Sequence, residues 1–221
     1  MMYQWDFNIL WGYRWLLLQG TLVTIGLTAA VVVLGLLVGL IAGLAQLSRS
    51  EILRWASWGY IELFRCTPLL VQLLWFYYAL PILTGIEISA IIASILTLSL
   101  YGGSFYAEVI RGGIQSIDSG QWEAGLALGL TPGKVMRRIV LPQAIKQMIP
   151  PLMNQSIIQF KNTSLVSVLA VPDLLYQGQS AATETYRPLE VYTIIAVIYF
   201  VVLVPLTAIV KKSEKSLRMS D

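Results

Sequence analysis

Long runs of hydrophobic residues dominate this chain, and short polar segments separate them. The first run covers about residues 16–47 and contains no charged residue. About twenty apolar residues in a helix cross the hydrocarbon core of a bilayer, so this run is long enough to span a membrane. The same pattern predicts four further spans, at residues 60–83, 89–107, 144–160 and 191–210. We therefore expect an all-α membrane protein of about five transmembrane helices, forming one domain over residues 1–221.

Small residues form a regular pattern within the first run. Gly35, Gly39 and Gly43 stand four apart, which places them on one face of a helix. Such a stripe permits close helix packing in lipid. Glycines tolerated by chance in a membrane helix would give the same pattern, and the sequence leaves both interpretations open.

Composition agrees with a membrane protein and removes most catalytic chemistry. Hydrophobic residues make up 57% of the chain and charged residues 12%, and the mean hydropathy is +0.70. Histidine is absent and Cys66 is the one cysteine, so neither a histidine base nor an intrachain disulfide is available. A phosphate-binding loop also fails at Gly129–Lys134, because Leu128 replaces its first glycine and Val135 follows the lysine. We expect no metal site, no catalytic residues and no enzyme activity.

The distribution of positive charge predicts the orientation. Cytoplasmic loops carry an excess of Lys and Arg, and here the flanks after spans one, three and five are the basic ones. The residues concerned are Arg49, Arg54, Arg111, Lys134, Arg137, Arg138, Lys146, Lys211, Lys212, Lys215 and Arg218. The N-terminus is therefore expected outside and the C-terminus in the cytoplasm of a multi-pass inner-membrane protein. Because the basic residues flank lipid-spanning segments, nucleic acid is not an expected partner.

A polar segment at residues 119–142 interrupts the hydrophobic pattern and has the spacing of two short helices joined by a tight turn. Asp118 or Ser119 is a candidate cap for the first helix, and Gly129 sits where a helix ends in a left-handed residue. Thr131 followed by Pro132 predicts the start of the second helix, which we expect Leu141-Pro142 to end. An ordinary loop is the alternative.

The second of these helices has two distinct faces. Lys134, Arg137 and Arg138 are expected to face water, whereas Val135, Met136 and Ile139 form an apolar stripe. In the predicted orientation this cationic hairpin lies in the cytoplasm.

The same segment resembles the EAA signature of ABC importer permeases, with Gly125 in place of the second alanine. The matching positions are Glu123, Ala124, Gly129, Ile139, Leu141 and Pro142. The resemblance implies a coupling-helix hairpin that docks into a cytoplasmic ATPase.

Polar residues at the start of the second predicted span also need an explanation, because a charge at the bilayer centre costs about 2.5–3.5 kcal/mol. Glu62 and Arg65 are spaced to pair along one helix face, or to lie in the headgroup region. The stretch from Arg65 to Gln72, which includes Thr67 and Pro68, is similar to an element of polar amino acid permeases. A proline inside a span frees carbonyl groups that must find partners or line a wet cavity.

The fourth predicted span is the most polar. Intervals of four and three place one set of residues on a single face, namely Gln147, Pro151, Asn154, Ile158 and Lys161. This face must meet protein or water, either as a wall of a substrate pathway or as interhelical hydrogen bonds.

The end of this span resembles the border of the substrate cavity in the same permeases, at Lys161, Asn162, Thr163 and Ser164. Lys161 is a candidate to pair with a substrate carboxylate, helped by the two hydroxyls, or to form a salt bridge with Glu108 or Glu184. Asn162 stands where the family often has an acidic residue. Beyond it, residues 171–176 predict a short helix outside the membrane with Pro172 in its first turn.

The resemblance extends to Tyr106–Ile117, where Glu108 and Arg111 are spaced as a helix pair, and covers nearly the whole chain. It implies a permease subunit of a type I ABC importer for polar amino acids, with two cytoplasmic ATPase subunits, a second identical or homologous permease subunit and an extracytoplasmic solute-binding protein as partners. ATP and Mg²⁺ would bind the ATPase, and no cofactor would bind this chain. The alternatives are an ion- or proton-coupled secondary carrier and a channel-forming oligomer, neither of which has a use for the hairpin.

Overall fold

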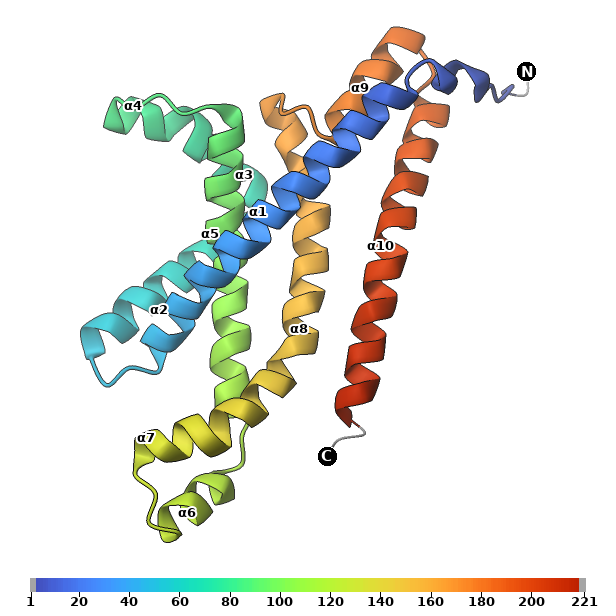
Figure 1. The fold of residues 1–221 in the computed structure, drawn as a ribbon. Coiled ribbons are helices and arrows are strands. Elements are labelled where there is room, and N and C mark those ends of the chain that lie inside the picture. Colours follow the sequence, from blue (N-terminus) through green and yellow to red (C-terminus); the bar gives the residue numbers. More distant parts are fainter. Residues whose placement is uncertain (1–2, 219–221) are drawn as a thin grey trace. The chain divides into compact units, whose positions relative to one another are not determined.

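The computed structural model describes residues 3–218, so the first two and last three residues of the predicted domain lie outside the described part. That part is helical and contains no strand, in agreement with the all-α prediction (Figure 1). The helices are α1 (Arg14–Gln46), α2 (Glu51–Cys66), α3 (Leu69–Leu74), α4 (Leu80–Thr84), α5 (Ala90–Gln115), α6 (Ser119–Ala127), α7 (Pro132–Val135), α8 (Leu141–Asn162), α9 (Leu174–Thr185) and α10 (Pro188–Arg218). Two short 3-10 segments are η1 (Asn8–Trp11) and η4 (Thr163–Leu169), and two π-helical turns are η2 (Trp75–Ala79) and η3 (Met136–Val140).

Three of these helices are long and apolar enough to cross a membrane, namely α1, α5 and the Pro188–Ser213 part of α10. The broken pair formed by α2 and α3–α4 adds a fourth if it is counted as one span. Helix α8 forms over the predicted fourth span but is not among these candidates within the described residues. The count of five spans therefore stays a prediction.

The predicted second span over residues 60–83 is interrupted by a bend of 106° in the structure. Helix α2 already begins at Glu51 and ends at Cys66, and Thr67 and Pro68 both have extended backbone, with ψ of 143° and 132°. The cause is local, because the proline ring disfavours the helical region for the residue before it. The third predicted span is also longer than expected, since α5 continues to Gln115.

The described residues divide into two compact units. The first comprises residues 3–33, 68–98 and 157–207, and the second comprises residues 34–67, 99–156 and 208–218.

In the second unit, the glycine stripe of α1 is a packing surface against α5. A Cβ atom on Gly39 would lie 2.5 Å from Cβ of Tyr106 and 2.9 Å from the carbonyl oxygen of Gly103. Tyr106 is fully buried, and its hydroxyl shares a 2.9 Å hydrogen bond with the Ser156 hydroxyl. The two backbones can approach this closely because Gly39 carries no side chain, which favours the packing interpretation over chance among the two that the sequence left open.

In the first unit, α9 packs between the beginning of α1 and the beginning of α10. Their shared core consists of Leu17, Leu174, Ala181, Ala182, Val191 and Ile195. Gly20 permits the contact, since its Cβ would lie 2.9 Å from the carbonyl oxygen of Asp173. The predicted helix at residues 171–176 therefore exists, but Pro172 precedes it and Asp173 is its N-cap.

The capping carboxyl group of Asp173 is buried. One oxygen accepts the Tyr176 N–H at 2.8 Å, and the other has no hydrogen-bond partner within residues 3–218. Burial disfavours the charged form and raises the pKa of Asp173 from 3.8 to about 6. At neutral pH the Asp173 carboxyl group is largely ionised, and burying this charge costs electrostatic free energy.

Replacing Gly39 tests the close contact between α1 and α5. Gly39→Ala should lower the free energy of unfolding by about 1–3 kcal/mol, because the new methyl group overlaps rigid backbone. The measurement is the thermal unfolding of the purified protein in detergent. Gly26→Ala on the same helix is the matched control, because its Cβ would have no neighbour within 4 Å. Equal melting temperatures for the two variants would contradict the packing described.

A second test concerns the buried carboxyl group of Asp173. The folded protein holds this proton more tightly than the unfolded chain, so the free energy of unfolding should fall as pH rises from about 4 to about 6. Asp173→Asn keeps an oxygen for the Tyr176 N–H but carries no charge, so it should lose this part of the pH dependence. Thermal unfolding of both proteins between pH 4 and 7 measures the difference. Parallel curves would show that Asp173 does not titrate in this range.

Candidate functional site

The segment at residues 119–142, called the elbow below, contains the candidate coupling residues and lies wholly in the second unit. Helix α6 begins after Asp118, whose carboxylate accepts the Gly120 N–H at 2.6 Å. The choice of Asp118 over Ser119 as the cap is thereby settled. The Gln121 side chain does not complete a capping box but accepts a 3.4 Å hydrogen bond from Gln143 at the start of α8.

The turn between α6 and α7 follows the expected chemistry. Gly129 has a φ of 76°, in the left-handed region, and donates its N–H to the Leu126 carbonyl at 2.9 Å. Leu130 donates to the Gly125 carbonyl at 3.2 Å, which completes a Schellman motif. Thr131 then caps α7, with Pro132 at its first position. The glycine is required here because other residues pay a steric cost at positive φ.

The expectation that Leu141-Pro142 ends the second helix is wrong. Helical backbone continues from Pro132 through η3 into α8, which begins at Leu141 and runs to Asn162. In η3 the Leu141 N–H donates to the Met136 carbonyl, five residues back. A π turn redirects the carbonyl ladder just before a proline that cannot donate, so the helix accommodates Pro142.

The two halves of the signature have different environments. Glu123, Ala124 and Gly129 are exposed, whereas Ile139 and Leu141 are half-buried. Ile139 packs against a core that joins the elbow to α5 and α8, formed by Ile110, Ile114, Ile117, Val135, Val140, Ala144 and Met148. The first half is thus presented to solvent, and Ile139 in the second half fixes the elbow to the helices behind it.

The exposed face of the elbow is both cationic and apolar. Lys134, Arg137 and Arg138 are exposed, as the two-faced pattern predicted. Leu126 and Leu128 are exposed too, Leu128 by 79%. The sequence analysis missed these leucines, although their position just before the left-handed Gly129 places them at the tip of a turn.

Gly125 is the position that departs from the resembled signature, and its surroundings explain the departure. It is buried, and an added Cβ would lie 2.9 Å from Cδ1 of Ile139 and 2.9 Å from a methyl group of Val135. The bulky side chains of α7 and η3 thus occupy the volume that an alanine would need.

The candidate pathway residues are divided between the units. Pro68, Gln72, Lys161, Asn162, Thr163 and Ser164 belong to the first unit, and Thr67 and Asn154 to the second. Within the first unit α3, which contains Gln72, packs against η4, which begins with Thr163 and Ser164. Two elements that carry candidate residues thus come together from positions far apart in the sequence.

Accessibility differs sharply among these residues. Lys161 is exposed and Asn162 is half-buried, whereas Thr163 is fully buried and donates its hydroxyl to the Phe160 carbonyl at 2.7 Å. Ser164 is half-buried and donates to the Lys161 carbonyl at 2.8 Å. Both hydroxyl protons are thus used by the helix end itself, and Lys161 is the accessible charge.

The polar stripe of α8 forms as one accessible face. Its members Gln147, Pro151, Asn154, Ile158 and Lys161 are all exposed. Gln155 and Gln159 alongside are buried, and within the described residues neither the amide oxygen nor the amide nitrogen of Gln159 has a hydrogen-bond partner.

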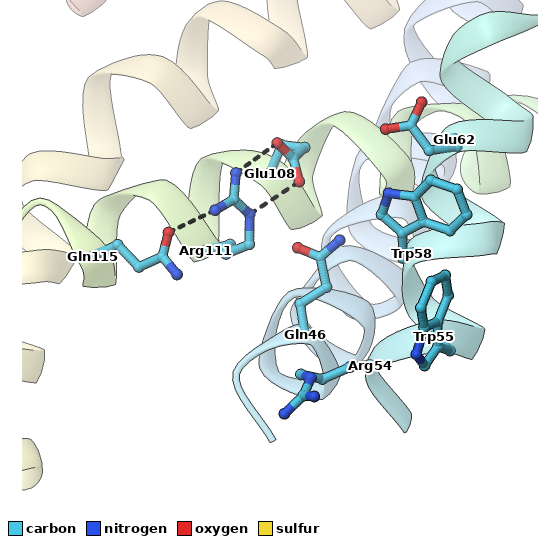
Figure 2. A pocket seen from close by; sticks show the side chains of 8 residues that line it. All are labelled: Gln46, Arg54, Trp55, Trp58, Glu62, Glu108, Arg111 and Gln115. Carbon is cyan, nitrogen blue, oxygen red and sulfur yellow. Dashed lines mark hydrogen bonds and ion pairs between the residues drawn. The ribbon is translucent and has the colours of Figure 1, made fainter. Parts of the chain in front are cut away.

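Charged residues of α2 and α5 form a cluster in the second unit (Figure 2). Glu108 accepts two hydrogen bonds from Arg111, at 2.9 and 3.1 Å, which confirms the predicted helix pair. Arg65 lies 3.5 Å from Glu108 and pairs with it, while Glu62 accepts from the Cys66 thiol. Glu108, which the sequence offered as a structural partner for Lys161, thus has its charge compensated within its own unit.

The packing around Gly125 generates a test of the elbow. Gly125→Ala should weaken the seat of α6 on α7 and raise the rate of proteolysis between residues 119 and 140, because the methyl group meets buried Val135. Gly133→Ala is the control, since its Cβ would have no neighbour within 4 Å. Val135→Ala combined with Gly125→Ala should return the proteolysis rate toward that of the parent. Cleavage rates that are the same for all variants would show that the contact does not hold the elbow.

Known proteins are similar to this chain in sequence and in fold. The chain is 35% identical to the glutamine transport system permease protein GlnP of Escherichia coli (strain K12) over 98% of this chain and 99% of that protein. It is 35% identical to the arginine transport system permease protein ArtQ of Bacillus subtilis (strain 168) over 93% and 94% of the two chains. A crystal structure of an amino acid ABC transporter with histidines contains a chain with 37% identity and a TM-score of 0.92, over 97% of this chain and all of that one.

The family assignment rests on most of the length. Residues 35–219 match the model of the binding-protein-dependent transport system inner membrane component. That range includes the elbow, the cluster around Glu108 and every candidate pathway residue. This chain therefore belongs to the family of binding-protein-dependent transport system inner membrane components, the permeases of ABC importers.

Proposed function

We propose that this chain carries a polar amino acid inward across the inner membrane, driven by ATP hydrolysis on separate subunits. The observation that carries the proposal is the elbow, which presents Glu123 and Ala124 to solvent while Val135 and Val140 fix it to α5 and α8. The substrate class is supported by relatives named for glutamine and arginine transport.

In the proposed mechanism, two ATPase subunits bind one elbow each from a pair of identical or homologous permease subunits. ATP and Mg²⁺ bind between the ATPases and not to this chain. When the ATPases close, the elbows are drawn together, and α5 and α8 follow because the elbow core joins them. A solute-binding protein delivers the amino acid from outside.

The orientation of the chain is part of the proposal. The exposed basic residues Lys134, Arg137 and Arg138 of the elbow, together with Arg49 between α1 and α2 and Lys211 in α10, favour the cytoplasm as their compartment. The N-terminus then lies outside and the C-terminus inside, so that the elbow faces the ATPases.

Lys161 is the residue we propose for recognition of the substrate carboxylate. It is exposed at the end of the polar α8 face, and the following residues Asn162 and Ser164 are half-buried beside it. An exposed cation favours a zwitterionic or acidic amino acid over a cationic one. Helix α3, which contains Gln72 and packs on η4, supplies the neighbouring wall.

A secondary carrier driven by an ion gradient was the alternative. Family membership favours the importer, and so does an exposed elbow that a carrier would not need. Uptake driven by an ion gradient without ATP would instead support the secondary carrier.

The test is uptake of radiolabelled amino acids into proteoliposomes that contain the permease, its ATPase and its binding protein. Uptake should require ATP, and Glu123→Lys should lower both uptake and substrate-stimulated ATP hydrolysis at least tenfold, because the change reverses a charge at the ATPase contact. Membrane insertion should be unaffected, since Glu123 is exposed and contributes nothing to the core. Glu87→Lys, at another exposed acid outside the elbow, is the control. Full stimulation in Glu123→Lys would refute the assignment of the elbow.

A further inference from the structure

A hollow of about 590 Å³ on the second unit lies outside both the elbow and the candidate pathway (Figure 2). The end of α1, helix α2 and the end of α5 surround it. Its lining residues are Gln46, Arg54, Trp55, Trp58, Glu62, Glu108, Arg111 and Gln115. None of them has a role in the transport mechanism proposed above.

Hydrogen-bond acceptors in this hollow are left without strong donors. Glu62 accepts only the weak Cys66 thiol at 3.2 Å within the described residues. The side-chain oxygen of Gln46 is buried and, in the same part of the chain, has no hydrogen-bond partner. Glu108 differs from both, because Arg111 and Arg65 already neutralise it. The unmet requirement of the site is therefore for a donor, and preferably for one with positive charge.

Two indole rings add a second preference for positive charge. Trp55 and Trp58 are 68% and 52% exposed, and their ring centroids lie 5.5 Å apart in an edge-to-face arrangement. Trp58 and Glu62 are four residues apart on α2, so the ring and the carboxylate lie on the same helix face. The face of a tryptophan ring attracts ammonium and guanidinium groups.

We propose that this hollow binds the ammonium or guanidinium group of a small organic cation, with Glu62 and the Trp58 ring as its partners. Arg54 lines the same hollow and pairs with the exposed Glu51 at 3.5 Å. Because 46% of the Arg54 side chain is exposed in this pair, its guanidinium group is also accessible to an anionic group on the same ligand. A free cationic amino acid and the ethanolamine headgroup of a phospholipid both have this chemistry.

The test is calorimetric titration of the full-length permease, purified with its partner subunits, in nanodiscs of phosphatidylglycerol and phosphatidylcholine. The probes are arginine and citrulline, which differ in having a charged guanidinium or a neutral ureido end. Arginine should bind more tightly than citrulline, whose α-ammonium group is its only positive charge. Glu62→Gln should weaken arginine binding about tenfold, because it removes a hydrogen bond to a charged group. Glu87→Gln is the control and should bind as the parent does.

The same titration in nanodiscs that contain phosphatidylethanolamine separates the two sources. Arginine binding that persists assigns the site to a free cation, and binding that is lost assigns it to the lipid headgroup. Equal binding of citrulline, or arginine binding unchanged in Glu62→Gln, would overturn the proposal. ATP-driven uptake measured on the same preparations tests the transport function separately, since Glu62 has no part in it.

Discussion

The burial of Val135 and Val140 against α5 and α8 is the contact on which the proposed coupling depends. Both valines are fully buried, and their neighbours include Ile110, Ile114 and Met148. Protein interiors are close-packed and deform little, so the elbow and the helices behind it behave as one body. A displacement of the exposed elbow face must therefore reach the membrane helices of this unit rather than being absorbed in a loop.

Polar and small residues also hold the helices of this unit together, because in lipid there is no hydrophobic driving force between helices. The Ser57 hydroxyl donates to the Ala42 carbonyl at 2.7 Å, and the Tyr60 hydroxyl donates to the Leu100 carbonyl at 2.5 Å. Arg65 adds its ion pair with Glu108. Helix α2 is thus tied to α1 and α5 by directional contacts, while the glycines of α1 allow the backbones to approach. Steric fit and hydrogen bonds hold the unit together.

Features set by local backbone chemistry could be predicted from the sequence, and features that depend on distant partners could not. The left-handed Gly129 and the Thr131-Pro132 helix start follow from the steric preferences of those residues alone. The extended residues at Thr67 and Pro68 also have a local cause, yet the apolar run around them concealed the break. The sequence spacing indicated Glu62 as a partner for Arg65 on the same helix, but Arg65 pairs with Glu108 on another helix.

The candidate site shows the same division. Helical spacing predicted the two faces of the helix formed by α7 and η3, and it predicted the polar face of α8. The burial of Thr163 and the packing of α3 on η4 depend on tertiary contacts, which spacing does not encode. From the sequence alone, Gly125 was a mild departure from the signature. The structure gives the reason for it, because Val135 and Ile139 fill the space that a side chain would need.

The π turn at Met136–Val140 sets the rotation of the elbow relative to the exposed face of α8. It accommodates one more residue than an α-helical turn, which rotates everything upstream by about 100° relative to an uninterrupted α-helix. The proposed docking face at Glu123 and the exposed α8 face at Gln147 and Asn154 therefore owe their relative orientation to a single residue in the chain. Substitutions at the exposed positions of this stretch keep that orientation, but gaining or losing one residue there would turn the proposed ATPase contact in the wrong direction while leaving both surfaces chemically intact.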